Sequence, residues 1–208
     1  MTEWYFRSLY YTIGLSCISF GVSLMVISNL GVGPWDALFV GLAGTIGLSV
    51  GSWILIVGSL LIILNGRLLR RRMDFTAFIT ILILGVLIDF WLMYVFPGML
   101  LTVLIVRLII LCLGITLIAL GVALYLQADF AKNPIDNLML AVQYRTGKSL
   151  TFCKTAIELT ALILAFLIGG PIGLGTVLVA FFIGPLINLF YTSISKRKFL
   201  KKTKILNS

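Results

Sequence analysis

The sequence predicts an all-α polytopic membrane protein with six transmembrane helices and two short re-entrant helices, arranged as two inverted-topology repeats. The first observation is composition: 61% of the residues are hydrophobic and 11% are charged, whereas a soluble domain carries about 25% charged residues. The second is a pattern of residues that recurs one hundred positions along the chain. The third is the gathering of Lys and Arg in a few short segments, as in loops beside the cytoplasmic leaflet.

The internal repeat aligns the two halves of the chain without a gap. Matches of Leu and Val are expected by chance in so apolar a chain. The informative matches are therefore those of Gly, Pro, Asp and Ser: Gly14/Gly114, Gly21/Gly121, Pro34/Pro134, Asp36/Asp136, Gly47/Gly147 and Ser49/Ser149. Further on the spacing slips by one residue, so that Gly85 and Asp89 correspond to Gly184 and Asn188. The chain then divides into a single membrane domain, 1–208, with repeat one at 8–98, repeat two at 101–193 and a basic cytoplasmic tail at 194–208.

Six apolar segments approach or exceed the length that a helix needs to cross a membrane, which is about 20 residues. They lie at about 8–28, 49–66, 75–95, 101–126, 150–168 and 174–193. Two shorter apolar segments, 34–46 and 134–145, each begin at a proline. Because they are too short to cross comfortably, we expect each to enter and leave the membrane on the same face.

The basic residues decide between eight spans and six. Arg67, Arg70, Arg71 and Arg72 form one loop, and six Lys and Arg residues lie in the tail 194–208. Eight spans would place that loop and the tail on opposite faces, against the positive-inside rule. Six spans place the loop and both termini in the cytoplasm. Each repeat then has three spans, so the two repeats face opposite ways.

The two short segments carry the candidate substrate or ion site. Each begins with Pro-x-Asp, at Pro34–Asp36 and Pro134–Asp136, and Pro suits the first position of a helix. Such helices would start inside the membrane, where non-helical backbone lines protein or a wet cavity. The candidate site residues are Trp35, Asp36, Asp136 and Asn137, with Gly33, Pro34 and Pro134 as structural residues. Two alternatives stay open: the aspartates only cap their helices, and Trp35 is an interfacial anchor.

Three further charges fall within the apolar segments, where charge is usually paired or functional. Asp89 and Arg107 lie equally far from the turn at 96–100, so we expect them to form a salt bridge. Glu158 corresponds to Gly58 in the first repeat and is therefore a further candidate for a protonatable or ligand-binding group. The alternative is a pair with Lys154, four residues earlier.

Several function classes are disfavoured. The chain has no His, and its three Cys residues lack the spacing of metal ligands, so we expect no metal, no cofactor and no enzyme activity. The net charge of +9 follows from basic loops rather than a nucleic-acid surface. The expected partners are membrane lipid and a small-molecule or ion substrate. Homo-oligomers remain open, because Gly47/Gly51 and Gly169/Gly173 have only weak G-x-x-x-G signals.

Several motifs carry a resemblance to a known family. They are Asn-Leu-Gly-Val-Gly-Pro-Trp-Asp-Ala-Leu at 29–38, Gly-Leu-Ser-x-Gly at 47–51, Gly-x-Gly-Thr at 173–176 and Gly-Pro-Leu-Ile-Asn at 184–188. With these motifs, residues of roughly 10–192 resemble the YczE/YyaS/YitT family of bacterial membrane proteins. The resemblance implies a multi-pass protein of the bacterial cytoplasmic membrane. It implies neither a substrate nor a catalytic residue.

Two functions remain from the sequence. The first is a transporter or channel for a small solute or ion, with its site between the two re-entrant helix starts, because inverted repeats with broken helices are typical of secondary carriers. The alternative is a non-transporting accessory membrane protein that acts in secretion or regulation through protein partners. A polar cavity that touches both helix starts would favour the first.

Overall fold

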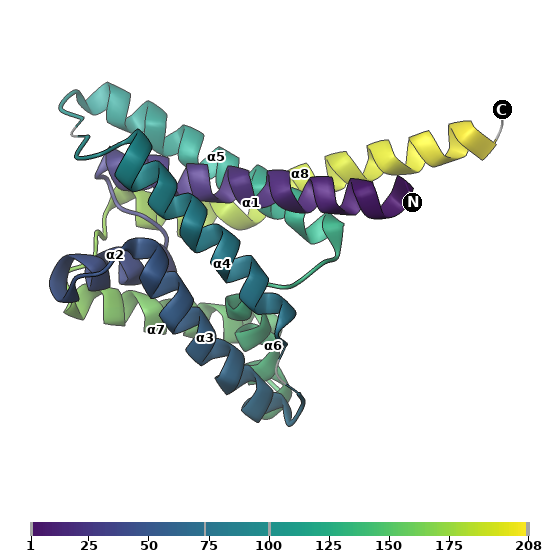
Figure 1. Ribbon diagram of the computed structural model, residues 1–208, viewed down its shortest axis with the longest axis horizontal. Coiled ribbons are helices and arrows are strands. Elements are labelled where there is room, and N and C mark those ends of the chain that lie inside the picture. The colour runs from purple at the N-terminus through teal and green to yellow at the C-terminus, as the bar shows by residue number, and fades with distance from the viewer. Residues whose placement is uncertain (1, 73, 100, 207–208) are drawn as a thin grey trace.

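The computed structural model describes residues 2–72, 74–99 and 101–206, and its regular structure in those ranges is entirely helical (Figure 1). The helices are α1 (Thr2–Ser28), α2 (Pro34–Ile46), α3 (Val50–Leu69), α4 (Thr76–Asp89), α5 (Leu104–Ala128), α6 (Pro134–Thr146), α7 (Leu150–Leu167) and α8 (Leu174–Leu206). A π-helix, η1 (Phe90–Val95), continues α4. The predicted basic tail begins within α8, and the side chains of residues 196–208 lie outside the described part of the chain.

Six helical stretches in the described ranges are long and apolar enough to cross a membrane. They are Trp4–Ser28, Val50–Leu69, Thr76–Val95, Leu104–Ala128, Leu150–Leu167 and Leu174–Ser195. These match the six segments predicted from the sequence. The remaining helices, α2 and α6, have 13 residues each, which is about 20 Å of helix and less than the roughly 30 Å hydrocarbon core.

The most extensive helix contact joins α1 to α5, which run in opposite directions (Figure 1). Gly14 lies against Gly121, and Gly21 lies against Gly114. A Cβ atom on Gly21 would lie 2.7 Å from the carbonyl oxygen of Gly114, and one on Gly121 would lie 2.6 Å from that of Gly14. Small residues let helix backbones approach this closely. The glycines that mark the sequence repeat are therefore the residues on which the two repeats meet.

Each short helix packs on a long helix of the other half of the chain. α2 crosses the end of α7, where Gly41 lies against Gly170. α6 crosses the end of α3, where the Asn65 side chain donates a hydrogen bond of 2.8 Å to the carbonyl of Pro134. The contacts of α2 with α7 and of α6 with α3 are thus equivalent between the repeats.

One helix pair breaks this equivalence. α3 and α4 pack closely where Gly51 meets Gly85. The Asp89 carboxylate accepts hydrogen bonds from the Ser49 hydroxyl at 2.5 Å and the Gly51 amide at 2.8 Å, so it binds the start of α3. The equivalent helices α7 and α8 make almost no contact. Gly184, which corresponds to Gly85, faces open space.

The predicted salt bridge between Asp89 and Arg107 is wrong. Asp89 is held by α3, as described above. Arg107 reaches the end of α1, where its Nε donates to the Ser28 carbonyl at 2.7 Å and its terminal nitrogen donates to the Asn29 carbonyl. Equal distance from a turn places two residues at the same depth, but it does not turn their side chains toward each other. Arg7, the equivalent of Arg107, instead pairs with Asp129 at 2.9 Å.

We predict that Gly21→Leu strongly lowers the melting temperature of the detergent-solubilised protein. The side chain has no room between α1 and α5, and overpacking typically costs about 1–3 kcal/mol. Thermal unfolding followed by size-exclusion chromatography gives the measurement. Gly44→Leu is the matched control, because nothing lies near Gly44. Equal melting temperatures for the two variants would contradict the close contact.

We also predict that the losses of stability from Asp89→Ala and Arg107→Ala add. The two side chains have separate partners, and independent sites usually add within about 0.5 kcal/mol. A double-mutant cycle on the melting temperature measures this. If the double variant instead recovered part of the lost stability, the result would support a salt bridge between Asp89 and Arg107.

Candidate functional site

The start of α6 holds the best-connected candidate acid. Asn133 caps the helix, since its side-chain oxygen accepts from the Ile135 amide at 3.1 Å. The Tyr125 hydroxyl from α5 donates to the Asp136 carboxylate at 3.1 Å and accepts from the Asn133 amide at 3.0 Å. Asp136 therefore does not act as the cap, and its side chain is held by a tyrosine from the neighbouring long helix.

Basic side chains lie near Asp136, and one of them pairs with a second candidate acid. Lys132 and Lys154 lie close enough to Asp136 for their charges to act on it. Lys154 also pairs with Glu158, with 3.8 Å between Nζ and Oε1. The sequence alternative for Glu158 is thus the arrangement observed. We name Lys132, Asp136, Lys154 and Glu158 the α6–α7 charge cluster. Asp136 is exposed and Glu158 is partly exposed on the protein surface, so the cluster is accessible.

The start of α2 is arranged differently. Gly33 precedes the helix without a side-chain cap, and the Asp36 carboxylate lies over it, 3.0 Å from where a Cβ would stand. Among the described residues, the Asp36 carboxylate has no hydrogen-bond or ion-pair partner. The indole nitrogen of Trp35 is buried and also lacks a partner there. Met25 stands where the second repeat has Tyr125, so this half lacks the hydroxyl that binds its aspartate.

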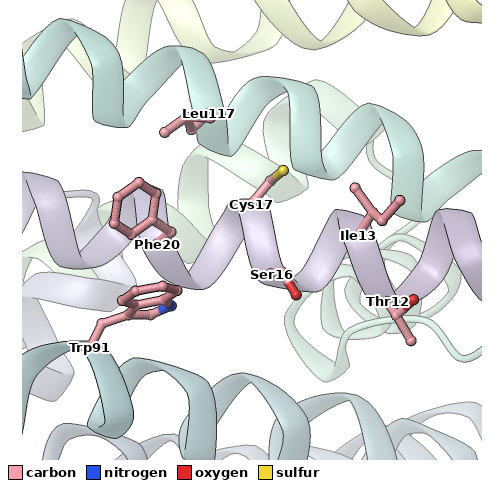
Figure 2. Close-up of a pocket in the computed structure, with 7 residues that line it drawn as sticks. All are labelled: Thr12, Ile13, Ser16, Cys17, Phe20, Trp91 and Leu117. Carbon is pink, nitrogen blue, oxygen red and sulfur yellow. The ribbon is translucent and has the colours of Figure 1, made fainter. Parts of the chain in front are cut away.

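Three of the cavities in the described part of the chain lie near these elements or along α1. One of 160 Å³ lies beside the start of α6 and is lined in part by Asn65 and Asn137. One of 410 Å³ lies across the end of α3 and the last turns of α6. The third, of 330 Å³, lies where the Phe20 and Trp91 rings meet, along the outer face of α1 (Figure 2). None of the three is lined by Asp36 or Asp136.

The structure thus joins some of the predicted site residues and separates others. Asp136 and Glu158 belong to one cluster and Asn137 lines a neighbouring cavity. Asp36 forms no hydrogen bond or ion pair with any of them in the described part of the chain. Sequence reasoning missed Asn65 and Tyr125. Both are polar residues in apolar helices at positions where the first and second repeats differ, and that difference was the available signal.

Comparison with known proteins places the chain in a family. A model described as a family of unknown function, DUF6198, matches residues 5–192. The chain is 40% identical to the uncharacterised protein YyaS of Bacillus subtilis over 198 residues, which covers 95% of this chain and 98% of YyaS. It is 35% identical to the uncharacterised membrane protein YczE of the same organism over 179 residues, which covers 86% of this chain and 82% of YczE.

An uncharacterised protein of Haemophilus influenzae is 31% identical over 182 residues, which covers 88% of this chain and 82% of that protein. No solved structure matches the chain. The family resemblance seen in the glycine and Pro-x-Asp motifs is therefore confirmed by relatives that span nearly the whole chain. This protein belongs to the family of unknown function DUF6198, and it is a relative of YyaS and YczE.

Proposed function

We propose that this protein is a carrier or channel for a small solute or ion in the bacterial cytoplasmic membrane, built from two inverted-topology repeats. The observation that carries the proposal is the antiparallel contact of α1 and α5 through Gly14, Gly21, Gly114 and Gly121. These helices occupy equivalent places in the sequence repeat, and equivalent helices run in opposite directions when the repeats are related by an axis in the membrane plane.

In this proposal α2 and α6 are re-entrant helices that approach from opposite faces. Their length of 13 residues and the non-helical segments 30–33 and 130–133 before them support it. Helix starts within the membrane present unpaired amide groups and a positive dipole end to a substrate. The termini, the arginine loop at 67–72 and the start of α7 lie in the cytoplasm.

We propose that the substrate contacts the α6–α7 charge cluster in the second repeat. In the first repeat, Asp36 is the proposed contact. Charged residues inside a membrane are costly, and they usually mark a substrate or ion pathway. The cluster combines two acids with two bases and holds one ion pair, Lys154–Glu158, so it can exchange that pair for contacts with a polar solute. Helices α3 and α4 pack closely, whereas the equivalent helices α7 and α8 hardly touch. This difference supports a transport cycle in which the two halves of the protein exchange these two packing arrangements.

The topology predicts a labelling pattern. In a variant without Cys17, Cys112 and Cys153, single cysteines at Arg70 and Thr146 should react with an impermeant maleimide only from the cytoplasmic side. Cysteines at Gly98 and Pro171 should react only from outside. Labelling is compared in intact and inverted vesicles. Reaction at Thr146 from outside would rule out the inverted repeat.

Transport predicts a specific effect of neutralising the acids. We expect Asp136→Asn, Glu158→Gln and Asp36→Asn to fold normally, because each keeps the size of its side chain. The substrate is first identified by screening proteoliposomes against a metabolite mixture. Each variant should then lower the uptake of that substrate about tenfold or more, because each loses one charge-assisted contact. Asp129→Asn, outside the cluster, should retain uptake. Folded variants with full uptake, or no uptake by any preparation, would favour the accessory-protein function.

A further inference from the structure

Each half of the chain contains a helical hairpin whose helices are joined at one end only. Segment 70–75 joins α3 to α4, and segment 168–173 joins α7 to α8. At the far end of the first hairpin, the Asp89 carboxylate at the end of α4 binds the start of α3. At the far end of the second, α7 and α8 stand apart (Figure 1), and nothing lies near Gly184. One hairpin is therefore closed at its far end, and the other is open.

Among the extensive contacts of α1–α8, the difference between the halves lies in these hairpins. α4 packs on α1 as α8 packs on α5, and α3 packs on α2 as α7 packs on α6. The crossings of α2 with α7 and of α6 with α3 are also equivalent. The open hairpin is thus one helix pair in a second arrangement, on the same frame of neighbouring helices.

The open end carries the polar groups that close the other hairpin. Asn188 stands at the position of Asp89, and its exposed side chain forms no hydrogen bond in the described part of the chain. Ser149 stands at the position of Ser49. The Ser149 hydroxyl accepts from the Phe152 amide but donates to no acceptor among those residues. Because an amide oxygen accepts hydrogen bonds as a carboxylate does, only the approach of α8 to α7 is missing.

The two hairpins would not close equally well. A hydrogen bond to a charged carboxylate is roughly twice as strong as one to a neutral amide, which favours Asp89 over Asn188. A Cβ atom on Gly51 would overlap the carbonyl oxygen of Gly85. Thr151, at the position of Gly51, carries such an atom, so α7 cannot approach α8 as closely as α3 approaches α4. Both differences favour the arrangement observed, in which the first hairpin is closed and the second is open.

The open end of the second hairpin is also where the α6–α7 charge cluster lies on α7. Glu158 is in the first half of α7 and stands at the position of Gly58, which packs against Ile81 of α4. Ala180 of α8 stands at the position of Ile81. A small residue on α8 thus corresponds to the larger one on α7, and a closing hairpin would bring α8 over Glu158.

We propose that Asp89 and Asn188 are the latches of two alternating gates, and that this structure is the inward-facing state. In the proposed transport function, on which this inference rests, the far end of α3–α4 faces outside and that of α7–α8 faces the cytoplasm. In the outward-facing state the Asn188 amide oxygen accepts from the Ser149 hydroxyl and the Thr151 amide, while Asp89 releases α3. The closing of α7 against α8 then shuts the charge cluster off from the cytoplasm.

Distances between spin labels test the gates in the full-length protein in lipid nanodiscs. In a cysteine-free variant, one pair of labels is placed at Leu48 and Tyr94, on the outer side. The equivalent pair is placed at Lys148 and Ser193, on the cytoplasmic side. All four side chains are exposed, and double electron–electron resonance measures each distance without added substrate. The protein with its native gates should show a short outer distance and a long cytoplasmic distance.

The combined substitutions Thr151→Gly and Asn188→Asp give the second hairpin the latch of the first. They should raise the ratio of closed to open cytoplasmic gates about tenfold, because a hydrogen bond to a charged acceptor is stronger than one to a neutral acceptor. The outer distance should lengthen as the cytoplasmic distance shortens. Thr192→Asp is the matched control, because it adds the same charge one turn along α8, and it should leave both distances unchanged.

The reciprocal substitutions weaken the outer gate. Gly51→Thr with Asp89→Asn gives the first hairpin the gate residues of the second, so the outer distance should lengthen and the cytoplasmic distance should shorten. If this variant does not fold, Asp89→Asn alone tests the same latch, because it removes only the charge of the carboxylate.

An unchanged cytoplasmic distance after Thr151→Gly with Asn188→Asp would overturn the proposal, and so would an equal effect of Thr192→Asp. A cytoplasmic gate that closes while the outer gate stays closed would overturn it as well, because the gates would then not alternate. The absence of metabolite uptake, with these changes in distance intact, would count against transport and would leave the two latches in place.

Discussion

The close approach of α1 and α5 is the constraint on which the rest of the structure depends. Glycines at four equivalent positions let the two backbones touch, and the opposite directions of the helices then fix where their ends lie. At one end Arg107 reaches the carbonyl groups that close α1. At the other end Arg7 reaches Asp129, just beyond α5. The coil before each short helix starts from these ends, so the α1–α5 contact also positions α2 and α6.

On this common frame the two halves carry different chemistry. Tyr125 binds Asp136 in the second half, while Met25 leaves Asp36 without an equivalent hydroxyl. Lys154 pairs with Glu158 in the second half, whereas Ile54 occupies the position of Lys154 in the first half. The α3–α4 pair is closed by Asp89, and Asn188, its counterpart, is exposed. In the proposed arrangement of two repeats, the shared positions form the scaffold, and we propose that binding sites lie at the positions where the repeats differ.

Much of the fold could be predicted from the sequence, because apolar length and the repeated glycines are one-dimensional signals. The six spans, the two short helices and their boundaries follow directly from them. The Asp89–Arg107 pair could not be placed in this way, because a count of residues from a turn gives depth and not the direction of a side chain. The Asn65–Pro134 and Tyr125–Asp136 bonds join different helices. They depend on tertiary crossings that no local pattern encodes, although the differences between repeats mark the residues.

The most direct test of this account is the relative direction of α1 and α5 in a lipid bilayer. This direction is measured by introducing pairs of cysteines into a cysteine-free variant and treating the protein with a short thiol cross-linker. The account predicts cross-linking between cysteines at Arg7 and Asp129 and between cysteines at Ser28 and Arg107, since these pairs lie together at opposite ends of the helices. The exchanged pairs, Arg7 with Arg107 and Ser28 with Asp129, should not react. Cross-linking of the exchanged pairs in place of the first two would mean parallel helices and would contradict the account.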